Sequence, residues 1–226
     1  MNGRLAAVTL VLLVASAAVP TTAGAAGAES DSALTVDLTR EGDAELTLTL
    51  AYDLTSDEER EAFATLRDDA EARNRTTATF RSRMESVAGS AANATGRSMT
   101  VSGASSAFRT TDGGDTGVVV LSVNWTAFAA VDGDRLTVGE PFASGFESDY
   151  PVRLVAPSGY ELDAAAVSPD DRDGRTAVWN ADTALDGFEA TFAAADDEST
   201  GTVDGFGPVA ALVALAGAVL LGNRRA

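Results

Sequence analysis

The chain has 226 residues with no histidine and no cysteine, and all 16 of its basic residues are arginine. These absences exclude disulfides, thiol nucleophiles, imidazole or thiolate zinc sites, the Ser-His-Asp triad and, without lysine, a Schiff base or a Ser-Lys dyad. The 34 acidic residues give a net charge of −18, so no basic patch can neutralise phosphates and nucleic-acid binding is not expected.

Residues 1–28 are expected to form a signal peptide. Arg4 supplies the positive charge, and residues 5–19 form an uninterrupted apolar run. Two small-x-small patterns follow, and cleavage is expected after Ala28, where the acidic part of the chain begins. The alternative is an uncleaved N-terminal anchor.

Residues 29–193 have the length of one domain, and its first elements are expected to be a β-hairpin. Apolar and polar residues alternate over residues 34–38 and again over 46–54. Residues 40–43, Arg-Glu-Gly-Asp, provide turn chemistry between the two runs. The pattern predicts two antiparallel strands with one buried face.

A helical insertion is expected after the hairpin. Ser56 is followed three residues later by Glu59, which predicts a capping box with acidic residues in the first turn. Apolar residues then recur at helical spacing in two groups, first Phe63, Leu66 and Ala70, and later Phe80, Met84, Val87 and Ala91. Because the intervening residues 68–79 are polar, the pattern predicts either one long kinked helix or two helices. An uninterrupted helix would bring Asn74 near the apolar stripe.

The strand period returns after Gly96. Longer strands are expected at residues 99–108 and 117–129, and in the second of these Trp125 shares an apolar face with Val119. Shorter strands are expected at residues 135–138, 142–146, 152–155, 160–162, 176–179 and 188–192. The predicted fold class is α+β, with an antiparallel β-sandwich-like domain and the helices packed on one side.

Residues 194–205 are expected to be an acidic linker, followed by a transmembrane or sorting helix at 206–222 and a basic cytoplasmic tail at 223–226. At about 1.5 Å per residue the 16 apolar residues 206–221 reach ~24 Å, a little less than a ~30 Å hydrocarbon core. A buried core helix is disfavoured because the span carries no polar stripe. Arg224 and Arg225 favour an inside C-terminus, so the expected topology is N-out and C-in at the cell surface.

Three of the four asparagines between residues 29 and 193 begin N-glycosylation sequons. They are Asn74-Arg75-Thr76, Asn93-Ala94-Thr95 and Asn124-Trp125-Thr126. This share exceeds the few times in a hundred, roughly, that chance would give at this serine and threonine content. N-linked glycans are expected at Asn93 and Asn124, and Asn74 is left open.

Clustered aspartates in turns are candidate calcium ligands, although none follows the spaced EF-hand loop. They are Asp112 with Asp115, Asp132 with Asp134, and Asp170 and Asp171 with Asp173. In so acidic a chain solvated turns are the preferred interpretation. No cofactor is expected. The one enzyme class that the residue inventory permits is a carboxylate-pair hydrolase, and the expectation is that the protein is not an enzyme.

The part of the chain expected outside the membrane is still more acidic. Without Arg4, Arg224 and Arg225, thirteen arginines face 34 acids, a net charge of −21. Such a charge repels itself in dilute buffer, whereas at molar salt the Debye length falls to about 3 Å. The lack of lysine and the many small residues are similar to proteins of extreme halophiles. The alternative is an acidic mesophilic protein.

Residues 204–208, Asp-Gly-Phe-Gly-Pro, precede the apolar span and the terminal arginines. This tail resembles the PGF-type C-terminal sorting signal of haloarchaeal surface proteins. The resemblance implies recognition by an archaeosortase through Gly205, Phe206 and Gly207, removal of the helix and a lipid anchor. Asp204 stands where that signal has proline, so retention of the helix as a permanent anchor is the alternative.

Residues 53–60, 114–119 and 139–142 also resemble a family of uncharacterised haloarchaeal extracytoplasmic domains. The resemblance implies a secreted or membrane-anchored domain with other envelope proteins as partners. Three functional hypotheses follow. The first is a structural or interaction module of the cell envelope, the second an ectodomain that senses a ligand or an ion, and the third a carboxylate-dependent hydrolase.

Overall fold

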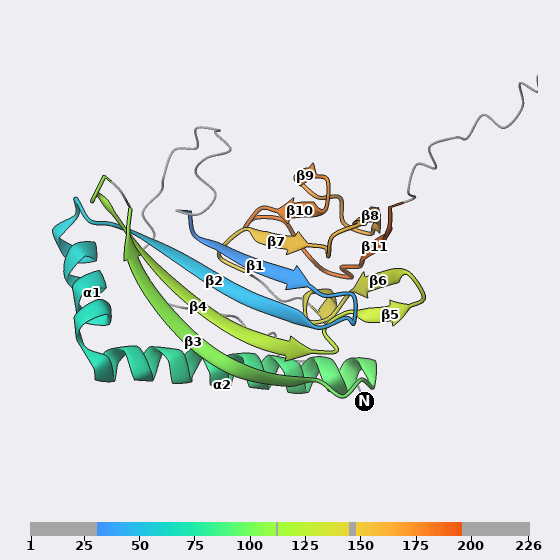
Figure 1. Cartoon of the computed structure of the whole chain (residues 1–226), viewed down its shortest axis with the longest axis horizontal. Coiled ribbons are helices and arrows are strands. Elements are labelled where there is room, and N and C mark those ends of the chain that lie inside the picture. The colour runs from blue at the N-terminus through green and yellow to red at the C-terminus, as the bar shows by residue number, and fades with distance from the viewer. Residues whose placement is uncertain (1–30, 112, 145–147, 196–226) are drawn as a thin grey trace, which may run out of the picture. The chain divides into compact units, whose positions relative to one another are not determined.

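The computed structural model describes residues 31–111, 113–144 and 148–195, which carry eleven strands, two α-helices and one short 3-10 helix (Figure 1). In chain order the elements are β1 Ala33–Leu38, β2 Ala44–Asp53, α1 Asp57–Asp68, α2 Ala70–Thr95, β3 Thr100–Thr110, β4 Thr116–Thr126, β5 Ala130–Asp132, β6 Arg135–Val138, η1 Phe142–Ser144, β7 Val152–Val155, β8 Tyr160–Ala165, β9 Asp171–Asp173, β10 Thr176–Trp179 and β11 Ala190–Ala194.

The strands form two sheets. The larger has seven strands in the order β3-β4-β2-β1-β7-β10-β9, and the smaller has four in the order β5-β6-β11-β8. Every pairing is antiparallel except that of β1 with β7, which is parallel. The predicted α+β class with mostly antiparallel, sandwich-like sheets is therefore confirmed, and the parallel pair was not foreseen.

The predicted β-hairpin is β1 and β2, with Val36 opposite Leu46 in register. Both residues are buried, as are the alternate residues on either side, so the period-2 pattern correctly identified the inner face. The turn closes when the N–H of Thr39 donates to the carbonyl of Asp43 at 2.8 Å. Gly42 has a φ of 83°, and a β-carbon there would lie 2.7 Å from the carbonyl oxygen of Ala129. Only glycine fits this position.

The helical insertion consists of two helices that are separated at one residue. Asp69 is extended, with φ −93° and ψ 108°, and its carboxylate accepts hydrogen bonds from the N–H groups of Glu71 and Ala72 at the start of α2. The Asp69 side chain thus caps α2 and satisfies backbone N–H groups that have no helical partner after the break. The break falls inside the predicted interval 68–79, and the two-helix alternative is correct.

The predicted capping box at α1 is wrong in its bonding. Ser56 is the N-cap residue, but its side chain makes no capping hydrogen bond. Glu59 does not reach back to Ser56 either. Its carboxylate accepts from the N–H of Asp53 at 2.8 Å, and so ties the first turn of α1 to the end of β2. The three acids at the start of α1 remain favourably placed against the helix dipole.

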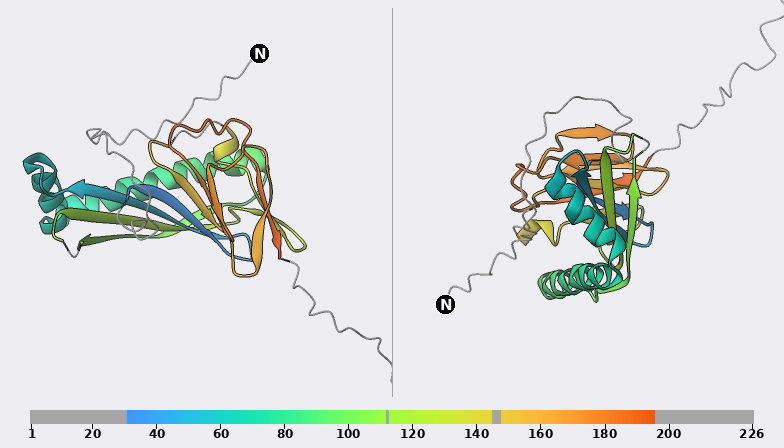
Figure 2. Two further views of the ribbon diagram at one scale, coloured as in Figure 1. Left: turned by 90° about the horizontal axis from the view of Figure 1, so that it is seen from above. Right: turned by 90° about the vertical axis from the view of Figure 1, so that its left-hand side faces the viewer.

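The helices and the smaller sheet cover the apolar face of the larger sheet. Along one half, buried residues of α2 such as Phe80 and Met84 join the core cluster of β2 and β4. The four-stranded sheet lies at the far end of the long strands from α1 (Figure 1, and the left view of Figure 2). Five aromatic rings run through the core with centroid distances between 4.9 and 6.3 Å, in the order Trp125, Phe128, Phe142, Phe188 and Trp179.

Strand β4 ends at Thr126, three residues before the predicted end. Ala127 has a φ of 55°, which interrupts the extended chain. Its N–H donates to the carboxylate of Asp43 at 2.8 Å, and the N–H of Ala129 donates to the carbonyl of Gly42 at 2.8 Å. A long-range contact with the β1–β2 turn therefore ends the strand, and the local pattern carries no trace of it.

Other differences are short elements. The expected strand at 142–146 is instead the 3-10 helix η1 over its first three residues, and residues 145–147 lie outside the described residues. Strands β5 and β9 were not predicted, and each has only three residues. The described structure continues through Ala195, whose N–H donates to the carbonyl of Gly159 at 2.7 Å.

Several predicted features lie outside the described residues. They are the signal peptide 1–28 with its cleavage site at Ala28, the rest of the linker, the helix 206–222, the sorting-signal residues Gly205, Phe206 and Gly207, and Arg224 and Arg225. In the part of the chain that the structure describes, neither helix has the length and apolar character needed to cross a membrane.

Candidate functional site

The three sequon asparagines are all exposed, and they sit on two elements that pack against each other. Asn74 and Asn93 lie on α2, and Asn124 lies on β4. Nothing in the structure tests whether they carry glycans, so their glycosylation stays a prediction. Their surroundings differ, and each is described in turn.

Asn124 lies on the outer face of the seven-stranded sheet, opposite Glu45 of β2 and Ser102 of β3. Its neighbour in the sequon, Thr126, lies on the same face because alternate residues of a strand share a face. The Thr126 hydroxyl is 2.7 Å from that of Thr100. Asparagine and threonine are thus presented together by the folded strand, within a surface rich in hydroxyl groups.

Beside Asn124 the edge strand β3 carries a bulge between Ser102 and Ser105. Gly103 lies in this bulge with a φ of 65°, and a β-carbon there would stand 2.6 Å from Nδ2 of Asn124. The bulge and the missing side chain together make room for the amide. Sequence reasoning missed Gly103, although an isolated glycine within a predicted strand is the usual signal of a bulge.

Asn93 lies in the last turn of α2, and Gly96, with a φ of 71°, caps the end of the helix. The hydroxyl of Thr95 donates to the carbonyl of Ala91 at 2.8 Å. Side chains two apart in a helix do not face each other, so Asn93 and Thr95 are presented together only where this last turn frays.

Asn74 is exposed within an unbroken part of α2. An uninterrupted helix from α1 onward was expected to bring it near the apolar stripe, and the predicted break is present. The helix break lies five residues earlier, at Asp69, and it rotates the following turns so that Ala72 is buried instead. Asn74 borders a hollow of about 380 Å³ between α2 and β3. The hollow is lined by Asn74, Thr77, Ala78, Arg81, Ala104, Ser105 and Ser106.

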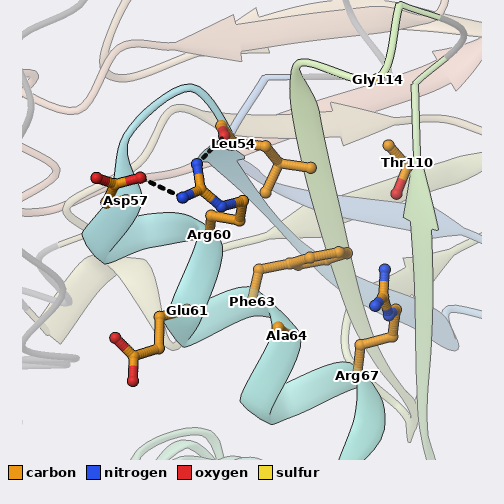
Figure 3. Close-up of a pocket in the computed structure, with 9 residues that line it drawn as sticks. All are labelled: Leu54, Asp57, Arg60, Glu61, Phe63, Ala64, Arg67, Thr110 and Gly114. Atoms are coloured by element: carbon orange, nitrogen blue, oxygen red, sulfur yellow. Dashed lines mark hydrogen bonds and ion pairs between the residues drawn. The ribbon is translucent and has the colours of Figure 1, made fainter.

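A second hollow, of about 630 Å³, lies between α1 and the tip of the β3–β4 hairpin (Figure 3). Its lining residues are Leu54, Asp57, Arg60, Glu61, Phe63, Ala64, Arg67, Thr110 and Gly114. Phe63 is buried beneath it, and a β-carbon on Gly117 would come within 2.8 Å of the Phe63 ring. The close approach of Gly117 explains how α1 docks against the sheet.

The charged groups of this second hollow are engaged with their own neighbours. Arg60 forms an ion pair with Asp57 and donates to the carbonyl of Leu54 at 3.2 Å (Figure 3). The Arg67 guanidinium lies 5.7 Å from the centre of the Phe63 ring. Arg67 also donates twice to Asp68 and lowers the pKa of that carboxyl. No carboxyl of the hollow faces another across it, since Asp57 and Glu61 both belong to α1.

The aspartate clusters divide between structural use and solvated turns. The carboxylate of Asp170 accepts from the N–H of Asn180 at 2.8 Å and from the hydroxyl of Thr183 at 2.7 Å, which lowers its pKa. Asp132 and Asp134 flank the exposed β5–β6 turn. Asp112 lies outside the described residues. Within the described residues, no three acidic side chains gather closely enough to hold a metal ion.

Comparison with known proteins adds a family match. A family model described as a domain of unknown function (DUF7345) matches residues 35–160, from β1 to the first residue of β8. The search of curated proteins gave no match. Strands β9, β10 and β11 follow the matched region, yet they complete both sheets, and β10 supplies the buried Trp179.

Proposed function

Given that the chain belongs to the family of the domain of unknown function DUF7345, we propose that it is a membrane-anchored, glycosylated cell-surface protein of a halophile. In this proposal residues 1–28 direct export, residues 206–222 anchor the chain with the C-terminus inside, and the domain between them is a non-enzymatic structural or interaction module of the envelope.

The filled core is the observation that favours a structural or interaction module rather than a ligand sensor. A sensing site would combine a pocket with converging acids and an accessible tryptophan. Trp125 is 1% exposed and Trp179 is 0% exposed, and the indole N–H of Trp179 donates to the carbonyl of Val167 at 3.0 Å. Both indole rings are committed to packing between the sheets, where they join two halves of one core.

A carboxylate-pair hydrolase has less support. Such an enzyme places two carboxyls across a groove, about 5–9 Å apart. The larger hollow offers Asp57 and Glu61, which lie four residues apart on one helix, and the Asp57 carboxylate is held by Arg60. The surface therefore supports contact with other molecules better than bond cleavage.

Export and glycosylation draw support from the sequence and from the exposure of the sequons. The three asparagines are exposed on α2 and β4. A glycan attached to any of them would therefore not have to enter the packed core. The acidic residues and the lack of lysine support a high-salt environment. Archaeosortase processing at Gly205 and Phe206 would replace the helix with a lipid anchor, whereas retention of the helix 206–222 would keep a protein anchor. Both alternatives attach the domain to the membrane.

The decisive experiment applies protease to intact cells of a halophilic host that produces the full chain. We expect digestion of the domain without lysis, partition of the protein with the membrane fraction, and glycopeptides at Asn93 and Asn124. Crosslinking in intact cells at molar salt should then join the domain to other envelope proteins. Protection of the domain until the cells are lysed would overturn the proposal.

A further inference from the structure

We propose that Asn74 carries a glycan whose first sugar residue lies in the hollow between α2 and β3 and holds these two elements together. This inference rests on the glycosylation in the proposed function. It goes further by assigning the sugar of one sequon a binding place on the protein surface. The occupant is the chain's own attached sugar, and the evidence is the shape, chemistry and position of the hollow.

The hollow follows from the small residues on its two walls. Asn74, Thr77, Ala78 and Arg81 are spaced by three, four and seven residues, so they form one stripe of α2. The opposite wall is Ala104, Ser105 and Ser106 of β3. No bulky apolar side chain fills the space between the two backbones, and about 380 Å³ remains open. This volume is at the lower end of ligand pockets, which start near ~300 Å³, and it suits a single sugar ring.

The lining also matches a polyol. The hydroxyl of Thr77 donates to the carbonyl of Arg73 at 3.0 Å, so its lone pairs remain available to accept hydrogen bonds. Ser105 adds no free hydroxyl, because its side chain is hydrogen-bonded to Ser122 on the outer face of the sheet at 2.8 Å. Arg81 donates through Nε to Glu85 at 2.7 Å, and its guanidinium has four further N–H groups. Small methyl groups at Ala78 and Ala104 can lie against the apolar face of a sugar ring.

Covalent attachment explains why this shallow site suits a linked sugar. The hollow is open, and its polar groups keep contact with water, so a free sugar would bind weakly there. A sugar attached to Asn74, at the rim, has an effective concentration in the millimolar range or higher, and weak contacts then suffice. The exposed Asn93 borders neither of these two hollows, so it serves as the reference sequon.

The helical setting fixes the order of events. Asn74 and Thr76 lie two residues apart within α2, where their side chains point in different directions. A transferase that reads both residues must therefore act before α2 forms. The sugar then enters the hollow when α2 packs against β3, and it stabilises the folded state alone.

The test compares thermal unfolding in molar salt for protein from a glycosylating host and from a host without the glycosylation machinery. Glycopeptide analysis of Asn74 comes first. In the glycosylated protein we expect N74Q to lower the unfolding midpoint by roughly 2–4 °C, and N93Q to leave it unchanged. In the unglycosylated protein N74Q should have no effect.

A second variant fills the hollow and keeps the sequon. Ala78→Leu should lower the midpoint of the glycosylated protein and spare the unglycosylated one, because leucine and the sugar compete for one space. Thr79→Leu, at an exposed neighbouring position outside the hollow, is the matched control. Glycans at Asn93 and Asn124 with a bare Asn74 would overturn this inference and leave the proposed function intact. Equal N74Q effects in both hosts would also overturn it, and bare asparagines at all three sequons would overturn both.

Discussion

The carboxylate of Asp43 accepts a hydrogen bond from the backbone N–H of Ala127 at 2.8 Å, across 84 residues of sequence. This contact fastens the β1–β2 turn to the chain just after β4. Ala127 lies there with a φ of 55°, an uncommon conformation for alanine that the surrounding contacts hold in place.

Asp43→Ala should destabilise the domain, because the N–H of Ala127 loses its partner in a partly buried setting. The expected loss in the free energy of unfolding is about 1–3 kcal/mol. Urea unfolding in molar salt measures it. Asp43→Asn keeps an acceptor and should lose less, whereas Glu45→Ala, on an exposed residue two positions later in β2, is the control. Equal stabilities for D43A and E45A would contradict the role of this contact.

Gly117→Ala should loosen α1 from the sheet, because the new β-carbon would stand 2.8 Å from the ring of Phe63. Overpacking of this kind typically costs about 1–3 kcal/mol. Gly113→Ala provides the matched control, since a β-carbon there has no neighbour within 4 Å. Limited proteolysis should cut α1 first in G117A, and cleavage patterns identical to those of G113A would contradict this docking.

Acid should remove part of the stability that Asp69 and Asp170 supply. Both have a pKa lowered by hydrogen bonds, chiefly from backbone N–H groups, so each folded pKa lies below its unfolded value. Their stabilisation is complete above the unfolded value and is lost as the pH falls through the folded value. Asp69→Asn retains a helix cap without a titrating group, so this variant should lose less stability than the parent between pH 5 and pH 2.

Asp37 should act in the opposite direction. Burial is the main cause that raises its pKa, although Arg175 and Arg153 oppose the shift. The folded state therefore binds the proton more tightly than the unfolded state, and the contribution of this group to stability increases as the pH falls through the raised value. Asp37→Asn should remove that dependence and should not destabilise the domain at pH 7. A clear loss of stability at pH 7 would contradict the desolvation argument.

Salt should raise stability steeply up to the molar range. The net charge of −18 on 226 residues repels itself when screening is weak. Urea midpoints should rise with sodium chloride and level off as the Debye length approaches about 3 Å. Sucrose at matched osmolality is the control, because it is excluded from the protein surface but does not screen charge. A response to sucrose equal to that to salt would contradict the electrostatic explanation.

The spacing of apolar residues along the chain predicted the longer helices and strands, because these elements depend on neighbouring residues in the sequence. The β1–β2 hairpin and the apolar face of β4 follow from alternation, and the two helices follow from a polar interval between apolar groups. The early end of β4 at Thr126 could not be predicted, because it depends on Asp43 far away in the chain. The three-residue strands β5 and β9 are too short to leave a pattern.

The candidate site was predicted only in part. The sequon motifs located Asn74, Asn93 and Asn124, and the structure exposes all three. The hollow beside Asn74 arises because Ala78 of α2 faces Ser105 and its neighbours on β3. That pairing of small residues is a tertiary relationship, and neither segment signals it alone. The bonding of Glu59 to Asp53 in place of Ser56 is a further tertiary choice that the capping motif did not reveal.

The parallel pairing of β1 with β7 has a consequence for biogenesis. Leu34 lies in register with Val152, so the strand that starts the domain needs a partner that the ribosome makes more than a hundred residues later. Until that partner arrives, one side of β1 is an open edge able to pair with foreign strands. Such late loop closure slows folding. A C-terminal truncation between residues 96 and 151 should therefore yield an aggregating fragment, even though the hairpin and both helices are present in it.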